Sequence, residues 1–499
     1  MHLVNFRFAK EAVTSCRWRT VQIVAAVLFA THALIAWYYA ARYERGEVGA
    51  GSKVLTLDMT FADWSKATEG MDSSSYLRVA ENFAARKGVT IRDTSSGVPR
   101  DVPFYYWAPG APVVFGAWLR LIGGHTMWTF FWFSVAAQLA FGVMAIATAA
   151  FWTRSSLALS TVALCTGFCP PLQDWLYGSN LTSSEIVALV SLSAVFFALA
   201  KGFAAYREIA GKVWSLAWMR RAGIWFALGG VLIGLYSLVR DAGAVFATFT
   251  AIFLLGRALI MDRSRFASAA VAAALLVAGT FAVRFPVERW NQRRIGNAVV
   301  CTSSAGCIWR YGLWLPHDSC DWFATSGIGF GQYLDPDAAK RVEQYYVDKK
   351  LLPELYSFSQ LLGAVCRRPV DAVTFRLARS PMLWLGSRSP LPNFEFGLVP
   401  IWCLGFYGSL AAFCVVQYRN RRRIPEVLYL FALLLICASP LIHCEFRYSF
   451  PVWNTLVLVP GLLAATLSRN GWLQQWCDRR PHDSAKPPLQ QPRPTPLAA

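Results

Sequence analysis

Long apolar stretches recur along almost the whole of this sequence, and they constrain its fold more than any other feature. One of them, MWTFFWFSVAAQLAFGVMAIATAAF at residues 127–151, contains no charged residue. The hydrocarbon core of a bilayer is about 30 Å thick and is crossed by about 20 apolar residues in a helix. Lipid offers no hydrogen-bond partners to a bare backbone, so such stretches form helices. The pattern therefore predicts an all-α polytopic membrane protein.

About ten stretches are long enough to span a membrane. Composition agrees, because 55% of the 499 residues are hydrophobic and only 15% are charged. The first stretch follows basic residues, but it is too long for a signal peptide and lacks a cleavage site, so we expect a retained span. The predicted spans are residues 21–41, 127–151, 157–172, 186–203, 222–239, 244–260, 267–283, 398–416, 427–442 and 450–467.

Lys and Arg gather in short clusters beside the apolar stretches. The formal net charge of +19 is therefore not arranged along one continuous basic face, and this argues against a nucleic-acid partner. With ten spans, the clusters all fall on one side, which predicts that this side and both termini are cytoplasmic. A bacterial cytoplasmic (inner) membrane is the expected location. The clusters are residues 1–20, Arg154, residues 201–221, Arg257, Arg263, Arg265, residues 419–423 and the chain from Arg469 onward.

Two long segments are then expected on the non-cytoplasmic face, residues 42–126 and residues 284–397. The first contains PVVFGAWLRLIGG at residues 112–124, which is too short to span and predicts a helix lying in the interface. In the second, residues 367–386 predict another interfacial helix and residues 335–350 a solvated one. Cys301, Cys307 and Cys320 lie in the second segment, either in a local disulfide or as free thiols.

These elements define the expected domain organisation. In chain order, we expect a cytoplasmic N-terminus (1–20), a transmembrane module (21–283) containing the first outer loop (42–126), an outer soluble segment (284–397), C-terminal transmembrane helices (398–467) and a cytoplasmic tail (468–499). The tail is rich in Pro and Gln from residue 481 and is expected to be disordered.

Candidate functional residues lie where the predicted spans meet the non-cytoplasmic face. Charged side chains are costly inside the hydrocarbon, so those at span ends are the informative ones. They occur in MDSSSY (Asp72, Tyr76), SNLTSSE (Glu185), LVRDAGA (Arg240, Asp241) and HCEFRY (His443, Glu445, Arg447, Tyr448).

Each of the four stretches also has a purely structural interpretation. Asp72 could cap the helix that it precedes, and Glu185 could stand in the first turn of the next. Arg240 could pair with Asp241 at the surface. Arg447 could extend to lipid headgroups with a carboxylate beside it.

The shared side of the four stretches favours a chemical role. A carboxylate at the headgroup level can act as a general base toward a hydroxyl or amine. Arg binds phosphate bidentately and stabilises the charge that develops as a phosphate leaves. Together these are the requirements for transferring a sugar from a lipid phosphate.

The order of these motifs resembles the GT-C superfamily of integral-membrane glycosyltransferases, which includes the protein O-mannosyltransferases and aminoarabinose transferases. The likeness rests on four features: Asp72 followed by SSSYLRVAENFAARKG, a Pro-Gly-x-Pro element at residues 109–112, the SNLTSSE turn, and an E-x-R-Y-x-x-P pattern at residues 445–451. It covers residues 21–467.

The resemblance implies a polyprenyl-phosphate-linked sugar donor and transfer to a glycan, lipid or protein acceptor on the outer face. Asp72 would be the base or would orient the acceptor, and Arg240 and Arg447 would hold the donor phosphate. Tyr76, Glu185, Asp241, His443, Glu445 and Tyr448 would support them. Many members have an Asp-Glu pair where this chain has a single acid, which leaves open whether Asp72 is the base or whether Asp58, Asp63 or Glu69 shares that role.

No residues show metal-ligand spacing, so we predict metal-independent transfer without a cofactor. Two other activities remain open. A flippase of lipid-linked sugars would carry charged residues near span midpoints and paired halves. An outer-face oligosaccharide polymerase or ligase would use a large outer loop such as residues 284–397.

Overall fold

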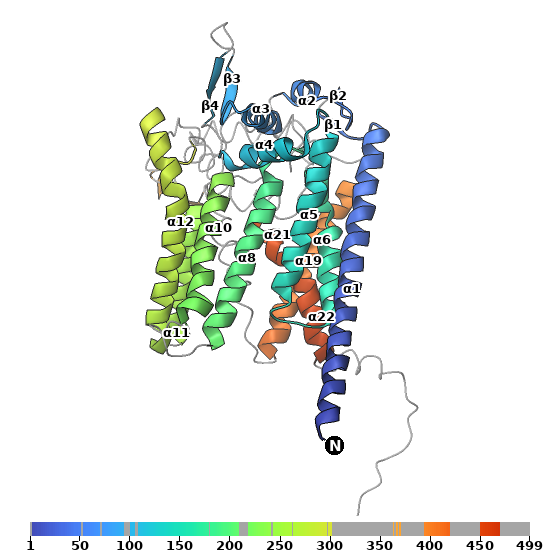
Figure 1. Ribbon diagram of the computed structural model, residues 1–499, viewed down its shortest axis with the longest axis vertical. Coiled ribbons are helices and arrows are strands. Elements are labelled where there is room, and N and C mark those ends of the chain that lie inside the picture. Colours follow the sequence, from blue (N-terminus) through green and yellow to red (C-terminus); the bar gives the residue numbers. More distant parts are fainter. Residues whose placement is uncertain are drawn as a thin grey trace, which may run out of the picture.

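The fold is a bundle of long helices with a layer of short elements across one end (Figure 1). A computed structural model describes residues 2–50, 53–69, 72–93, 100–104, 108–178, 180–208, 218–240, 243–261, 263–296, 298–301, 394–419 and 450–469, with isolated positions between 363 and 370. We refer to the end that carries the short elements as the site end.

Within the described residues, six helices are long and apolar enough to cross a membrane. They belong to α1 (His2–Glu44), α5 (Trp128–Ala149), α8 (Ser184–Glu208), α10 (Ile224–Val239), α11 (Gly243–Met261) and α12 (Phe266–Ile295). They confirm the expectation of a helical membrane protein. The number of ten spans stays a prediction, and residues 427–442 lie outside the described residues.

Two predicted spans are interrupted helices. Residues 157–172 form α6 (Ser156–Gly167) and the start of α7 (Pro170–Tyr177), and residues 450–467 form α21 (Phe450–Leu456) and α22 (Val459–Arg469). Proline explains both interruptions, because it lacks the backbone N–H and disfavours helix in the residue before it. Pro170 opens α7, and Pro460 stands in the first turn of α22.

The closest helix packing in the bundle joins α10 to α12. Gly230 and Gly234 have the spacing of a G-x-x-x-G motif on α10, and a Cβ at Gly230 would overlap the carbonyl oxygen of Leu276 on α12. Thr280 on α12 donates a hydrogen bond to the Gly230 carbonyl oxygen at 3.1 Å. Small residues and interhelical hydrogen bonds hold helices together where lipid is as apolar as the side chains.

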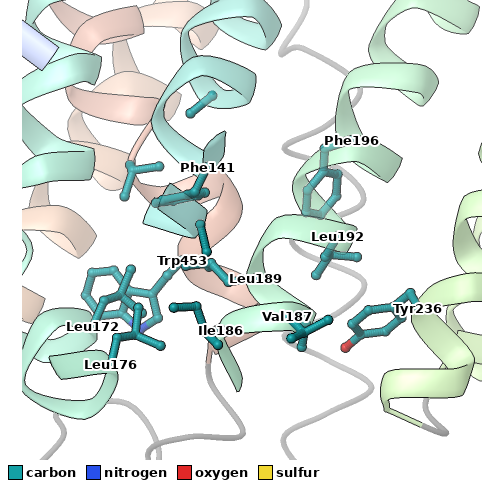
Figure 2. Packing of buried hydrophobic residues seen from close by; sticks show 14 of the residues in the cluster. Phe141, Leu172, Leu176, Ile186, Val187, Leu189, Leu192, Phe196, Tyr236 and Trp453 are labelled. Atoms are coloured by element: carbon teal, nitrogen blue, oxygen red, sulfur yellow. The ribbon is translucent and has the colours of Figure 1, made fainter. Parts of the chain in front are cut away.

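Large apolar side chains fill the rest of the bundle. Trp453 of α21 is fully buried in a cluster with Leu172 and Leu176 of α7 and Ile186 of α8 (Figure 2). Dispersion between such close-packed groups contributes little per atom pair but adds up over a whole side chain. α21 is thereby joined to α7 and α8, although it lies far from both in the sequence.

The layer at the site end consists of elements from the first predicted outer loop. α2 (Phe61–Ala67), α3 (Asp72–Ala84) and α4 (Gly110–Ile122) lie there, with α4 running across the ends of the spanning helices (Figure 1). Two antiparallel strand pairs complete it, β1 (Gly49–Ala50) with β2 (Lys53–Val54) and β3 (Thr90–Asp93) with β4 (Arg100–Pro103). The expected helix at residues 112–124 is α4, two residues earlier.

Basic residues of two predicted cytoplasmic clusters share the opposite end of the bundle. The Tyr206 hydroxyl donates a hydrogen bond to the Arg265 carbonyl oxygen at 3.1 Å, and the Lys201 amine lies 4.0 Å from the Trp225 ring centroid. A short π-helix, Met219–Gly223, and a 3-10 turn, Arg263–Arg265, also belong to this end. The membrane side that it faces stays a prediction.

Candidate functional site

Three helix ends meet at the site end and bring together residues that lie far apart in the chain. They are the first two turns of α3 with Asp72 and Tyr76, the first turn of α8 with Glu185, and the residue after α10, Arg240. The sequence places these residues in three separate motifs. The structure joins four of the predicted site residues in one cluster.

Glu185 and Arg240 form the strongest contact of this cluster. An Arg240 guanidinium nitrogen donates to Glu185 Oε1, and the side chains are 2% and 21% exposed. Removing two charges from water is unfavourable, and their attraction offsets that penalty only when they remain paired. The sequence allows Arg240 to pair with Asp241, which lies outside the described residues, whereas the structure pairs Arg240 with Glu185.

Tyr76 stands beside this ion pair. Burial raises the pKa of the Tyr76 hydroxyl far above its usual value, with Asp72 raising it further, Arg240 opposing and Glu185 adding to the increase. The hydroxyl is also hydrogen-bonded to Ser184. Tyr76 thus keeps its proton near neutral pH, so it can orient a ligand or a neighbouring carboxylate but cannot be the base.

The Pro-Gly-x-Pro element fixes α4 against α10. Pro109 is the N-cap of α4, and a Cβ at Gly110 would lie 2.6 Å from the Leu238 carbonyl oxygen. Only glycine permits that approach. Because Leu238 lies two residues before Arg240, the element holds the layer of short helices next to the guanidinium.

α3 is held on two sides. Arg120 of α4 donates hydrogen bonds to the carbonyl oxygens of Phe83 and Ala84 at the end of α3. Thr182, which is fully buried before α8, donates to the Ser73 carbonyl oxygen at 2.9 Å. The second bond ties the start of α3 directly to the start of α8, where Asp72 and Glu185 lie.

The three alternative acids have other partners. Asp58 accepts a hydrogen bond from Trp128 Nε1 at 3.0 Å, and Asp63 accepts one from Thr60 at 2.6 Å in the first turn of α2. Glu69 lies 3.8 Å from Arg78, with 72% of its side chain exposed. None of these contacts involves the Glu185–Arg240 pair, which favours Asp72 among the candidate acids.

Several predicted site residues lie outside the described part of the chain. They are Asp241, His443, Glu445, Arg447 and Tyr448. Cys307 and Cys320 lie outside it as well, whereas Cys301 is buried against Ala108 and Val300. The roles of these site residues and the disulfide question stay predictions.

Sequence reasoning missed two members of the cluster. Ser184 links Tyr76 to Glu185, since its hydroxyl donates to Glu185 Oε2 at 3.4 Å. Tyr236, one turn before Arg240, is buried near the same ion pair. The several Ser and Thr residues of SNLTSSE could have indicated that a hydroxyl group such as that of Ser184 lies beside Glu185. Tyr236 gave no signal, because an aromatic residue in an apolar span is ordinary.

Within the described residues, no group of three or more His, Cys, Asp or Glu could hold a metal ion. The cluster offers instead two carboxylates (Asp72 and Glu185), the guanidinium of Arg240 and the three hydroxyl groups of Tyr76, Ser184 and Tyr236. This set suits hydrogen bonding to a phosphate and a polar acceptor.

Comparisons with known proteins give distant structural likenesses. No protein-family model and no curated protein matches the chain. Among solved structures, the Archaeoglobus fulgidus oligosaccharyltransferase tethered to an acceptor peptide overlaps with a TM-score of 0.48 at 12% identity, over 90% of this chain and 51% of that one. Its apo form gives 0.49 at 13% identity, over 90% and 52%.

A third structure is the same archaeon's oligosaccharyltransferase AglB with an inhibitory peptide and a dolichol-phosphate. It overlaps with a TM-score of 0.46 at 12% identity, over 93% of this chain and 52% of that one. This chain thus spans about half the length of these neighbours. Likeness of this extent does not establish a family, so any activity must be argued from the residues of this chain.

Proposed function

We propose that this protein is a membrane glycosyltransferase that moves a sugar from a polyprenyl-phosphate donor to an acceptor at the site end of the bundle. The observation that carries the proposal is the convergence of Asp72 and Tyr76 with the Glu185–Arg240 pair. A buried ion pair at the edge of an apolar bundle is unfavourable to build and contributes little to stability. Its presence beside a second carboxylate favours a chemical role.

In the proposed reaction Asp72 accepts a proton from the acceptor hydroxyl or amine. The acceptor atom attacks the anomeric carbon of the sugar while the bond from that carbon to the phosphate oxygen breaks. The polyprenyl phosphate leaves with the bonding electron pair, and the proton on Asp72 passes to solvent. Arg240 stabilises the negative charge on the leaving phosphate.

The neighbours of Arg240 set its geometry in this scheme. Glu185 fixes one edge of the guanidinium, and the partly exposed remainder can bind phosphate. Tyr76 supplies a neutral hydroxyl donor beside Asp72. Arg447, oriented by Glu445, is the proposed second phosphate ligand; His443, Tyr448 and Asp241 would line the same pocket. We place this site on the non-cytoplasmic face of the inner membrane.

The test is transfer of a radiolabelled sugar from polyprenyl phosphate in membranes, with extract of the source cell as acceptor. Asp72→Asn keeps the size of the side chain but removes the base, and general-base catalysis is worth about 100- to 10,000-fold. We expect a loss within this range. Glu69→Gln is the matched control, since Glu69 is an exposed carboxylate of the same loop.

Normal transfer by Asp72→Asn would contradict the assignment of the base. Loss of transfer in Glu69→Gln would move that role to Glu69. If wild-type protein transfers no sugar with any tested donor and extract, the glycosyltransferase proposal fails.

One observation favours the flippase alternative. His32 is 2% exposed near the middle of the spanning part of α1, with Nδ1 2.8 Å from the Leu28 carbonyl oxygen. A titratable side chain inside a spanning bundle is typical of transport pathways. Movement of a labelled lipid-linked sugar between leaflets by purified protein, lost in His32→Leu, would support transport instead of transfer.

A further inference from the structure

The last turns of α12 carry an exposed surface of arginine and aromatic side chains, which we call the α12 arginine surface. Its members are Phe285, Arg289, Trp290, Arg293 and Arg294. Phe285, Arg289 and Arg293 follow one another at four-residue spacing, and Trp290 and Arg294 form the adjacent strip. Arg284 and Asn291 lie on the opposite side of the same turns, and both are buried. One helix segment thus has a face toward the protein and a face away from it.

The length of α12 places this surface beyond the hydrocarbon. The helix has 30 residues, which corresponds to about 45 Å, against about 30 Å for the bilayer core. Its apolar part ends before Arg284, and the following turns lie at the site end (Figure 1). Exposed Trp and Phe at such a position are typical of the headgroup region.

Two of the arginines lie over aromatic rings. The Arg289 guanidinium carbon is 5.3 Å from the Phe285 ring centroid, and that of Arg294 is 4.3 Å from the Trp290 centroid. A guanidinium over a ring face keeps N–H donors for a phosphate. Across the described residues, no carboxylate forms an ion pair with Arg289, Arg293 or Arg294, although Arg284 nearby pairs with Glu288.

Attraction of cations to a helix C-terminus accounts for only part of this arrangement. It favours Arg293 and Arg294 in the last turn, which ends at Gly296 in the left-handed conformation. It explains neither Arg289, more than a turn earlier, nor the exposed rings of Phe285 and Trp290. A partner that is apolar on one side and anionic on the other matches the whole surface.

We propose that the α12 arginine surface binds the headgroups of anionic phospholipids in the membrane leaflet at the site end. The rings lie at the level of the upper acyl chains and the guanidinium groups at the level of the phosphates. This enriches negative lipid around α12, independently of any transferred sugar.

The test uses full-length protein in phosphatidylcholine vesicles that contain a small, equal fraction of brominated phosphatidylglycerol or brominated phosphatidylcholine. Bromine quenches nearby tryptophan, and subtracting the signal of Trp290→Phe isolates the emission of Trp290. The attraction of one arginine to anionic headgroups corresponds to about fivefold enrichment of anionic lipid over neutral lipid beside it. We expect phosphatidylglycerol to quench Trp290 severalfold more strongly, and salt to reduce the difference.

The variant R289Q/R293Q/R294Q should bring the two lipids to equal quenching. R293Q alone removes an arginine without a stacked ring and should lower the ratio partly, which keeps the test valid if the triple variant folds poorly. R92Q, an exposed arginine on β3, is the control and should leave the ratio unchanged.

Three results would overturn the proposal. Equal quenching by both lipids in the wild type would show no charge preference, and absence of quenching would show that Trp290 does not face lipid. Relief of quenching by polyprenyl phosphate at one equivalent would assign the surface to that lipid instead.

Discussion

Helix α10 makes two very different contacts, one with α12 along its length and one at the site where it ends. At Gly230 and Gly279 the two helices approach so closely that a Cβ would meet backbone atoms of the other helix, and neither glycine brings a charge to the contact. At the site end, α10 is followed by Arg240, which is 21% exposed and is paired with the buried carboxylate of Glu185. Close backbone packing joins helices in lipid without removing a charge from water, whereas a buried ion pair carries a large desolvation penalty. The difference favours a functional reason for the pair.

The largest effect on stability is expected from separating that pair. Arg240→Gln leaves Glu185 buried without its cation, which destabilises by about 3–5 kcal/mol. The double variant Glu185→Gln/Arg240→Gln removes both charges and should recover most of this loss. Denaturant unfolding in detergent measures both.

Measuring sugar transfer by the double variant then distinguishes a structural role of the ion pair from a role in the reaction. If Arg240 binds the donor phosphate, the double variant should be stable but inactive. Recovery of both stability and transfer would show that the pair only holds α8 against α10, and the comparison above would lose its functional meaning.

A smaller loss is expected at the close helix contact. Gly230→Ala places a Cβ onto the Leu276 carbonyl oxygen, so α12 must move away and lose packing over several turns. We expect a destabilisation of about 1–3 kcal/mol. Gly256→Ala on α11 is the control, because nothing lies within 4 Å of the new Cβ. It should be neutral or stabilising by up to about 1 kcal/mol. Equal behaviour of the two variants would show that close approach does not hold α10 to α12.

Sequence reasoning predicted the parts of the molecule in which one physical rule dominates. Span-length apolar stretches identified the six long helices, because lipid leaves the backbone no alternative. The cost of charge in lipid selected Asp72, Glu185 and Arg240, which the structure brings together.

Other features depend on long-range contacts that periodicity does not encode. Which partner Arg240 takes is decided by the approach of α8, 55 residues away in the chain. The interruption of a predicted span at Pro170 depends on a single residue within an apolar stretch, and Ser184 gains its role only once α3 packs beside α8.

The smallest predicted effect concerns the hydrogen bond that links the two helix starts of the site. Thr182→Val keeps the shape of the side chain but removes the donor to the Ser73 carbonyl oxygen, and loss of one buried hydrogen bond typically destabilises by about 1–2 kcal/mol. Because the bond sets the position of Asp72 relative to Glu185, sugar transfer should fall about tenfold or more, beyond what the loss of folded protein explains. Thr182→Ser, which restores the donor, should recover transfer.

Thr161→Val is the matched control, since Thr161 donates only to the carbonyl oxygen of Leu157 one turn earlier on the exposed side of α6. It should change neither stability nor transfer appreciably. If Thr182→Val loses stability but transfers sugar normally per folded molecule, the hydrogen bond between α3 and α8 contributes only to packing, as the glycine contact does. Asp72 then does not depend on this bond for its activity.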